Sequence, residues 1–194
     1  MESLLREILK CSACAAHLPH QPRPVVAAGV SSKILIIGQA PGRRVHESGV
    51  PWEDQSGKTL RQWLGVEAEA FYNPARFALV PMGFCYPGAG KSGDLPPRPE
   101  CAPLWHPRLL GRLKSVQLML LIGQYSQAYY LGGSIRENLT ETVRHGREYL
   151  PQYLPLPHPS PRNGIWLRRN PWFAAEILPT LRQTVAHILG GETK

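Results

Sequence analysis

The 194-residue chain lacks any long apolar run, and no stretch approaches the roughly 20 apolar residues of a membrane-spanning helix. Its first ten residues carry two glutamates and lack the continuous apolar segment of a signal peptide. They instead show the spacing of one apolar face of a short helix, formed by Leu4, Leu5, Ile8 and Leu9. We therefore expect a cytosolic protein without a membrane span.

Acidic residues are scarce as well. The chain has 14 acidic and 22 basic residues, which gives a formal net charge of +8, and 16 of the basic residues are arginine. Arginine pairs bidentately with phosphate and stacks on bases in ways that lysine cannot. This excess favours a polyanionic partner, although charge alone leaves nucleic acid and acidic membrane surfaces both open.

Cysteine occurs only four times. In a cytosolic protein we expect these residues to be reduced thiols or metal ligands, not disulfides. Cys11 and Cys14 form a CxxC pair, and Cys85 and Cys101 flank a segment rich in proline and glycine. The pattern favours a four-thiolate site, which either zinc or an iron–sulfur cluster would fill, and the spacing does not choose between them.

Short apolar runs that end near Gly or Pro predict strands at residues 33–38, 76–81, 116–122 and 153–157. Helical spacing falls between and after them, at residues 56–64, 103–113, 126–131 and 171–189, the last as one helix or a broken pair. This alternation predicts an α/β fold, a three-layer α/β/α sandwich with a central four-stranded, mostly parallel sheet. We expect a single domain over residues 1–194, in which residues 1–30 form the N-terminal helix and the CxxC segment.

Two loops follow predicted strands, where ligands bind in such sheets. Gly38-Gln-Ala-Pro-Gly42 has glycines that permit a close backbone approach to a ligand, although the same residues suit an ordinary βα turn. His158-Pro-Ser-Pro-Arg-Asn163 mounts a histidine between prolines at a strand end. A phosphate-binding loop at Ser56-Gly-Lys-Thr59 is disfavoured, because Trp52 stands where that motif needs its first glycine.

Together the two loops resemble the signature loops of the uracil-DNA glycosylase superfamily. Gly49-Val-Pro-Trp-Glu-Asp-Gln-Ser-Gly57 and Leu120-Leu-Ile-Gly123 extend the resemblance over most of the chain. It implies a four-stranded parallel sheet between helices, and an enzyme that flips uracil or a related deaminated base out of DNA and excises it by hydrolysis. The implied partner is damaged DNA, bound by a monomer in a bacterial cytosol or nucleoid, with no membrane involved.

The resemblance also implies roles for individual residues. His158 would donate a hydrogen bond to the departing base, stabilising the negative charge that develops as the glycosidic bond breaks. Gln39 would act with it, and the base pocket would comprise Gly38, Ala40, Gly42 and the stacking residue Trp52. The DNA-binding residues would be Ser160 and Pro161, which pinch the backbone, Arg162, which fills the gap left by the base, and Asn163, Arg43, Arg44, Arg168 and Arg169.

The cysteine pattern resembles that of the thermostable-type branch of the superfamily, family 4. This branch carries a [4Fe-4S] cluster on an N-terminal CxxC pair and a later cysteine pair at similar spacing. The resemblance therefore favours a [4Fe-4S] cluster over zinc on Cys11, Cys14, Cys85 and Cys101. The cluster would fasten the N-terminal helix and the 85–101 segment to the sheet, without a redox part in the hydrolysis.

The chain departs from the family pattern where an acid is expected. Ala40 stands where many members have an aspartate for the attacking water, and Gln39 stands where the cluster-bearing branch has glutamate. Pro81 stands about where a base-reading asparagine would be. The carboxylates that could replace the missing acid are Glu47, Glu53 and Asp54.

These departures leave other functions open. One is a non-catalytic DNA-damage-binding protein of the same fold. Another is a covalently trapping one, because His46 in Arg43-Arg-Val-His46 resembles a sugar-trapping histidine of another branch, although the same segment also suits a phosphate-binding patch. A third is a zinc-stabilised α/β protein that acts on a small nucleotide.

Overall fold

A computed structural model describes residues 1–91 and 93–190. The helices are α1 (Glu2–Leu9), α2 (Arg43–Ser48), α3 (Gln55–Leu64), α4 (Ala68–Phe71), α5 (Cys101–Leu110), α6 (Gln124–Leu131), α7 (Leu139–Arg144), α8 (Gly164–Arg169) and α9 (Leu178–Leu189). The strands are β1 (Ile34–Ile37), β2 (Phe77–Leu79), β3 (Ala89–Gly90), β4 (Gly93–Asp94), β5 (Leu118–Ile122) and β6 (Tyr153–Leu156). Short 3-10 turns include Ala15–His17 and Pro161–Asn163, and a stretch of π-helix covers Phe173–Ile177.

Four strands form the central sheet, in the order β2-β1-β5-β6, and every neighbouring pair is parallel. The register pairs Ile34 with both Phe77 and Leu118. From β1 the chain passes to β2 at one edge of the sheet, and then to β5 on the other side of β1. The strand order therefore reverses between β1 and β5. Ligands bind beyond the carboxyl ends of strands at such a reversal. The predicted α/β fold with a four-stranded parallel sheet is confirmed.

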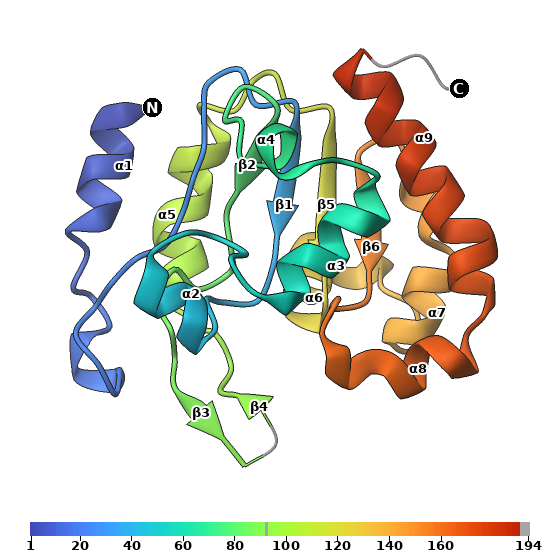
Figure 1. Cartoon of the computed structure of the whole chain (residues 1–194). Coiled ribbons are helices and arrows are strands. Elements are labelled where there is room, and N and C mark those ends of the chain that lie inside the picture. Colours follow the sequence, from blue (N-terminus) through green and yellow to red (C-terminus); the bar gives the residue numbers. More distant parts are fainter. Residues whose placement is uncertain (92, 191–194) are drawn as a thin grey trace.

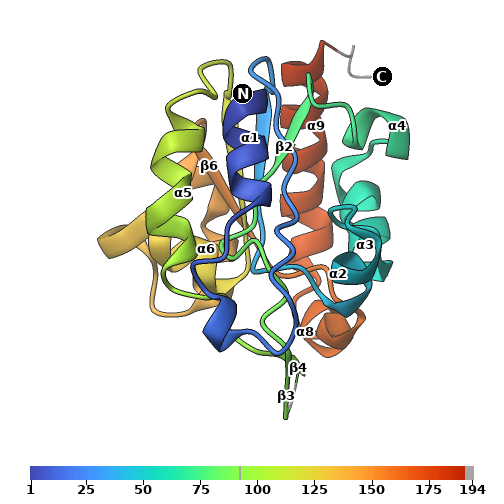
Figure 2. The ribbon, with the colours of Figure 1, turned by 90° about the vertical axis from the view of Figure 1, so that its left-hand side faces the viewer.

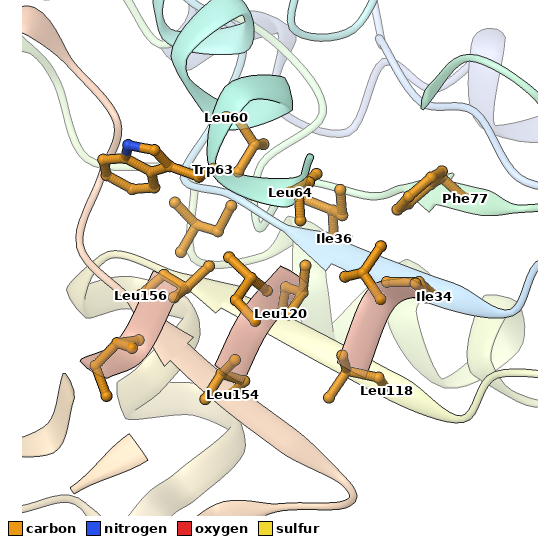
Figure 3. Close-up of a cluster of buried hydrophobic side chains, with 14 of the residues drawn as sticks. Ile34, Ile36, Leu60, Trp63, Leu64, Phe77, Leu118, Leu120, Leu154 and Leu156 are labelled. Carbon is orange, nitrogen blue, oxygen red and sulfur yellow. The ribbon is translucent and has the colours of Figure 1, made fainter. Parts of the chain in front are cut away.

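Both faces of the sheet are covered, which explains why β1 is apolar at every position and buried throughout. One face packs against α3 and α9. On the α3 side, Leu60, Trp63 and Leu64 meet Ile36 and Leu120 (Figure 3). The other face packs against α1, α5 and α6. Figure 2 shows these two helical layers on opposite sides of the strands. The fold is therefore the three-layer sandwich that the sequence predicts.

Several boundaries differ from the predicted ones for local reasons. Helix α5 begins two residues before the predicted start, so that Pro103 falls in the first turn, where proline is tolerated, and it ends at Leu110. The predicted C-terminal helix is a broken pair, in which the π-helix precedes α9. The predicted apolar face of α1 is partly wrong: Leu4 and Ile8 are buried, whereas Leu9 is 55% exposed.

A two-stranded antiparallel hairpin, β3–β4, projects beyond the lower edge of the sheet in Figure 1. Strands β1 and β6 point toward the same edge, and α2 and α8 lie on either side of it. Sequence reasoning did not predict the hairpin, α2 or α7. Within residues 1–91 and 93–190, no helix is long and apolar enough to cross a membrane.

Candidate active site

A cavity of about 330 Å³ opens at the carboxyl edge of the sheet. It lies between the loop that follows β1 and the loop that follows β6. The first loop lines it with all of its residues, 38–42, and the second contributes His158, Ser160, Pro161 and Arg162. The two loops that the sequence singles out, about 120 positions apart, therefore form opposite walls of one cavity.

Trp52 forms the wall between these loops. Its ring faces the imidazole of His158, with centroids 5.8 Å apart and an angle of 28° between the planes. Two glycines permit this placement: a Cβ at Gly38 would lie 2.7 Å from the indole, and one at Gly57 would lie 1.8 Å from the carbonyl oxygen of Trp52. Trp52 also adopts a φ of 59°, in the left-handed region that bulky residues rarely occupy. The backbone thus holds the indole in the cavity at a conformational cost.

His158 lies two residues after the end of β6, and its loop is braced because Asn163 Nδ2 donates to the His158 carbonyl oxygen at 2.7 Å. Burial lowers the pKa of the imidazole, and the nearby negative charge of Asp54 opposes this shift. A lowered pKa keeps the ring neutral near pH 7, with one N–H donor and one acceptor. In this state the side chain can donate a hydrogen bond without being a cation.

Asp54 is the one member of the predicted carboxylate trio that lines the cavity, whereas Glu47 and Glu53 are exposed outside the lining. Its Oδ1 accepts a hydrogen bond of 2.8 Å from Gly57 N and caps helix α3. The capping bond fixes the carboxylate at the start of a helix, where the helix dipole favours negative charge. Asp54 therefore brings a fixed carboxylate to the cavity that also holds His158.

The β3–β4 hairpin contributes a second carboxylate, Asp94, at the rim of the cavity. Desolvation raises the pKa of Asp94, and the charge of Arg162 and a hydrogen bond from Tyr86 oppose the shift. Gln39 anchors the segment that follows the hairpin, since its Nε2 donates to the Leu95 carbonyl oxygen at 3.0 Å. Sequence reasoning missed Asp94, because a Gly-Asp pair within a segment rich in proline and glycine looks like any turn.

The family comparison agrees with this geometry. Residues 26–182 match the family model of the uracil DNA glycosylase superfamily. The chain belongs to this superfamily. Membership implies binding of damaged DNA and suggests a DNA glycosylase of base excision repair.

The predicted DNA-binding residues of this superfamily member fall into two groups, apart from Asn163, which lies outside the cavity lining and bonds to the His158 carbonyl oxygen. Ser160, Pro161 and Arg162 line the mouth of the cavity. The Ser160 hydroxyl accepts a hydrogen bond of 3.2 Å from Arg162 N, which shapes the turn that carries the arginine. The other arginines lie outside the cavity and are exposed: Arg43 and Arg44 begin α2, and Arg168 and Arg169 end α8. Both helices border the edge where the cavity opens (Figure 1).

His46, the residue that resembles a sugar-trapping histidine, lies outside the cavity lining. Its ring stacks on His20, with centroids 5.4 Å apart, and packs against Tyr86 at 5.9 Å. Burial is the main cause of the lowered pKa of His46. This position beside the cavity favours a packing role for the ring over attack on a sugar.

The four cysteines of the glycosylase-like chain line a second, smaller cavity, although they come from three separate segments. Phe84 N donates to the Sγ of Cys101 at 3.3 Å. Burial raises the pKa of Cys85 to about 11 and that of Cys101 to about 12. The predicted association of the CxxC pair with the later pair therefore agrees with the arrangement of the described residues, whereas the occupant of the cavity stays a prediction.

A buried histidine that sequence reasoning missed supports the floor of the active-site cavity. His106 on α5 is 1% exposed, and its Nε2 lies 3.0 Å from the carbonyl oxygen of Pro81, a lining residue. That oxygen can only accept, so Nε2 carries the proton and Nδ1 accepts from the Tyr130 hydroxyl at 2.5 Å. Burial lowers the pKa of His106 to about 4. Nothing in the local sequence distinguishes this residue from an ordinary helix position.

Proposed function

We propose that the chain is a monofunctional DNA glycosylase that hydrolyses the N-glycosidic bond of uracil or a related deaminated base in DNA. The observation that carries the proposal is the meeting of His158, Trp52 and the backbone of residues 38–42 around one cavity. The glycosidic carbon is unreachable inside stacked DNA, so the nucleotide must first be flipped into such a cavity. Trp52 offers the flipped base an aromatic wall, and the close glycine backbone brings amides within its reach.

His158 would stabilise the leaving group. When the bond between the sugar and the base breaks, the electron pair leaves with the base and negative charge develops on a carbonyl oxygen of the base. A neutral imidazole held in position can donate a hydrogen bond to that oxygen, and one preorganised donor of this kind contributes about 3–4 kcal/mol in comparable sites. The lowered pKa of His158 supports this neutral role.

Asp54 would supply the carboxylate that the first loop lacks. Its Oδ1 is engaged by the helix cap, which leaves the other oxygen to accept a proton from water. The oxygen of that water bonds to the sugar carbon as the base departs, and the carboxylate charge also stabilises the cationic sugar in the transition state. Ala40 and Gln39 then need not provide an acid. The carboxylate would then come from a different position in the sequence than the family pattern has it.

The DNA would be gripped at the mouth of the cavity. Ser160 and Pro161 stand beside the opening, where they can hold the phosphates on either side of the flipped nucleotide. Arg162 projects from the same turn and would enter the space that the base vacates. The exposed arginines of α2 and α8 would add phosphate contacts, which carry affinity without sequence preference.

We further propose that Cys11, Cys14, Cys85 and Cys101 hold a [4Fe-4S] cluster, which would join the chain to the family 4 branch. The residues fit such a group: the four thiols share one cavity, and two residues that line it carry buried N–H groups without a partner, Arg98 Nε and Trp105 Nε1. Thiolates bind iron clusters directly. When bound, the cluster would fasten the N-terminal segment to α5, and the hydrolysis needs no electron from it.

Zinc is the less favoured occupant. The cysteine pattern resembles that of the cluster-bearing branch at all four positions, and zinc is the other metal that four thiolates would bind. Iron and acid-labile sulfide content, with absorbance near 400 nm, would support the cluster, and a colourless protein containing zinc would contradict it.

The test of the proposed activity is direct. Purified protein is incubated with single- and double-stranded oligonucleotides that carry uracil, hypoxanthine or xanthine, and abasic sites are then cleaved with alkali. Strand scission at the modified base is expected. Binding without scission on every substrate would instead support the non-catalytic damage-binding protein, and an alkali-resistant protein–DNA adduct would support covalent trapping.

A further inference from the structure

Two residues that line the cavity of the four cysteines each carry a buried N–H group without a partner. Among the described residues, the buried side-chain nitrogens and oxygens that lack any hydrogen bond are His46 Nδ1, Arg98 Nε and Trp105 Nε1. Arg98 and Trp105 both line the cysteine cavity. Buried donors are nearly always paired in folded proteins, so two unpaired ones in one cavity suggest that an acceptor belongs there.

The indole of Trp105 is held in place from its other side. Trp105 lies one helical turn after Cys101, so that both side chains project from the same face of α5. The guanidinium of Arg108 covers its ring at 5.0 Å from the centroid. Arg108 is held in turn by Glu7 of α1, through two hydrogen bonds of 2.7 and 2.5 Å. Because Trp105 is only 5% exposed and covered in this way, its N–H cannot turn to water.

Arg98 is constrained in a similar manner. Its Nη2 donates to Glu100 at 2.7 Å, which holds the end of the guanidinium and leaves Nε on the buried side. The backbone N–H of Phe84 already donates to the Sγ of Cys101. Three residues that line the cavity of the four thiols, Phe84, Arg98 and Trp105, thus carry N–H donors.

We propose that Trp105 Nε1 and Arg98 Nε donate hydrogen bonds to sulfur atoms of the cluster and thereby raise its reduction potential; this rests on the cluster assignment proposed above. Reduction adds negative charge, which is shared by the sulfur atoms. An N–H donor stabilises this charge more in the reduced cluster than in the oxidised one, so its removal lowers the potential. These hydrogen bonds would act on the cluster alone and leave the excision chemistry unchanged.

The experiment compares two tryptophans on opposite faces of the sheet. Trp105→Phe removes the N–H and keeps an aromatic ring, whereas Trp63→Phe removes an equally buried indole, 7% exposed, far from the cysteines. The full-length proteins are purified without oxygen, and iron, sulfide and midpoint potential are measured. At a fixed potential, the ratio of reduced to oxidised cluster in Trp105→Phe should fall about tenfold, a shift of about 59 mV for one electron. The Trp63→Phe potential should match that of the wild type.

Each other outcome overturns a defined part of the inference. Wild-type protein without iron contradicts the cluster and, with it, the role of both donors, while the excision assay is unaffected. Iron-loaded Trp105→Phe with the wild-type potential contradicts the role of Trp105 alone. An equal shift in Trp63→Phe would assign the effect to altered packing and would also contradict it. Arg98→Lys, which keeps the charge but has no nitrogen at the Nε position, should lower the potential in the same direction.

A second measurement needs no variant, in case Trp105→Phe fails to retain iron. Wild-type protein is labelled with ¹⁵N at the indole nitrogen of tryptophan, and electron–nuclear double resonance is recorded on the reduced cluster. A hydrogen bond from the indole to a cluster sulfur predicts a ¹⁵N coupling. A labelled, iron-loaded protein without that coupling overturns the inference.

Discussion

The indole of Trp52 lies face to face with the imidazole of His158, 5.8 Å away, at the carboxyl edge of the sheet. Gly38 makes the arrangement possible, because any side chain there would enter the space of the indole. Gly38, which follows β1, thus determines whether the ring of Trp52 can lie beside His158, two residues after β6. Trp52 therefore lies against both signature loops.

Gly38→Ala should reduce excision about tenfold or more, while the melting temperature changes little. The new Cβ would lie 2.7 Å from the indole, and the ring must move away from His158, since the Trp52 backbone is held against Gly57. Loss of an aromatic platform typically costs about 1–3 kcal/mol per stacked base. The smaller ring of Trp52→Phe, combined with Gly38→Ala, should recover part of the rate. Wild-type activity in the single Gly38→Ala variant would contradict this coupling.

Asp54→Asn separates the chemical role of Asp54 from its structural one. Asparagine caps helices as well as aspartate does, so the bond from Gly57 N and the stability should be retained. The amide cannot accept a proton from water, and single-turnover excision should therefore fall about 100-fold or more. Glu53→Gln, a neighbouring exposed carboxylate outside the cavity lining, serves as the control and should remain active. Excision that survives in Asp54→Asn would assign the carboxylate elsewhere.

The exposed arginines at the end of α8 should affect affinity without affecting base preference. Each phosphate contact that is lost lowers the slope of log affinity against log salt by about 0.9 for duplex DNA. Arg168→Gln combined with Arg169→Gln should flatten the slope by up to about 2 units, with unchanged relative rates across damaged bases. Binding titrations at several salt concentrations measure this. Arg6→Gln on α1, which removes a charge paired with Glu2, is the control. An equal change of the salt slope in this variant would assign the effect to the overall charge of the protein and not to contacts at α8.

His106 should make the protein less stable in acid. Its pKa falls from 6.5 in the unfolded chain to about 4 when it is buried, so the unfolded chain binds the proton first as the pH falls. Stability from this group is complete above about pH 6.5 and is lost between there and about pH 4, by up to about 3 kcal/mol. Urea unfolding at pH 7.5 and 4.5 should therefore show a smaller acid loss in His106→Gln than in the wild type. Equal losses would contradict the buried neutral state.

The fold could be predicted from the sequence because its signals are local. Each central strand is a short apolar run that ends near Gly or Pro, and the helices between them have clear spacing. The two loops were identifiable because Gly38–Gly42 and the residues around His158 carry specific motifs next to strand ends. Residues 26–182 then show the family directly.

The parts that could not be predicted depend on contacts distant in the sequence. Asp94 reaches the cavity through a hairpin that Gln39 anchors more than 50 positions away. His106 matters only because the folded chain brings Pro81 to its ring. The sequence could not single out Asp54 from Glu47 and Glu53, because the position of the Asp54 carboxylate depends on its capping bond at the start of α3. The single domain, the monomeric state and the role of each site residue stay predictions.

The central claim is that His158 drives bond cleavage, and it is tested by single-turnover excision of uracil from an oligonucleotide by His158→Ala. The account predicts a loss of about 1,000-fold or more, with DNA affinity within about tenfold of the wild type, because the imidazole acts on the leaving base more than on bound DNA. A His158→Ala protein that excises uracil at the wild-type rate would contradict the mechanism.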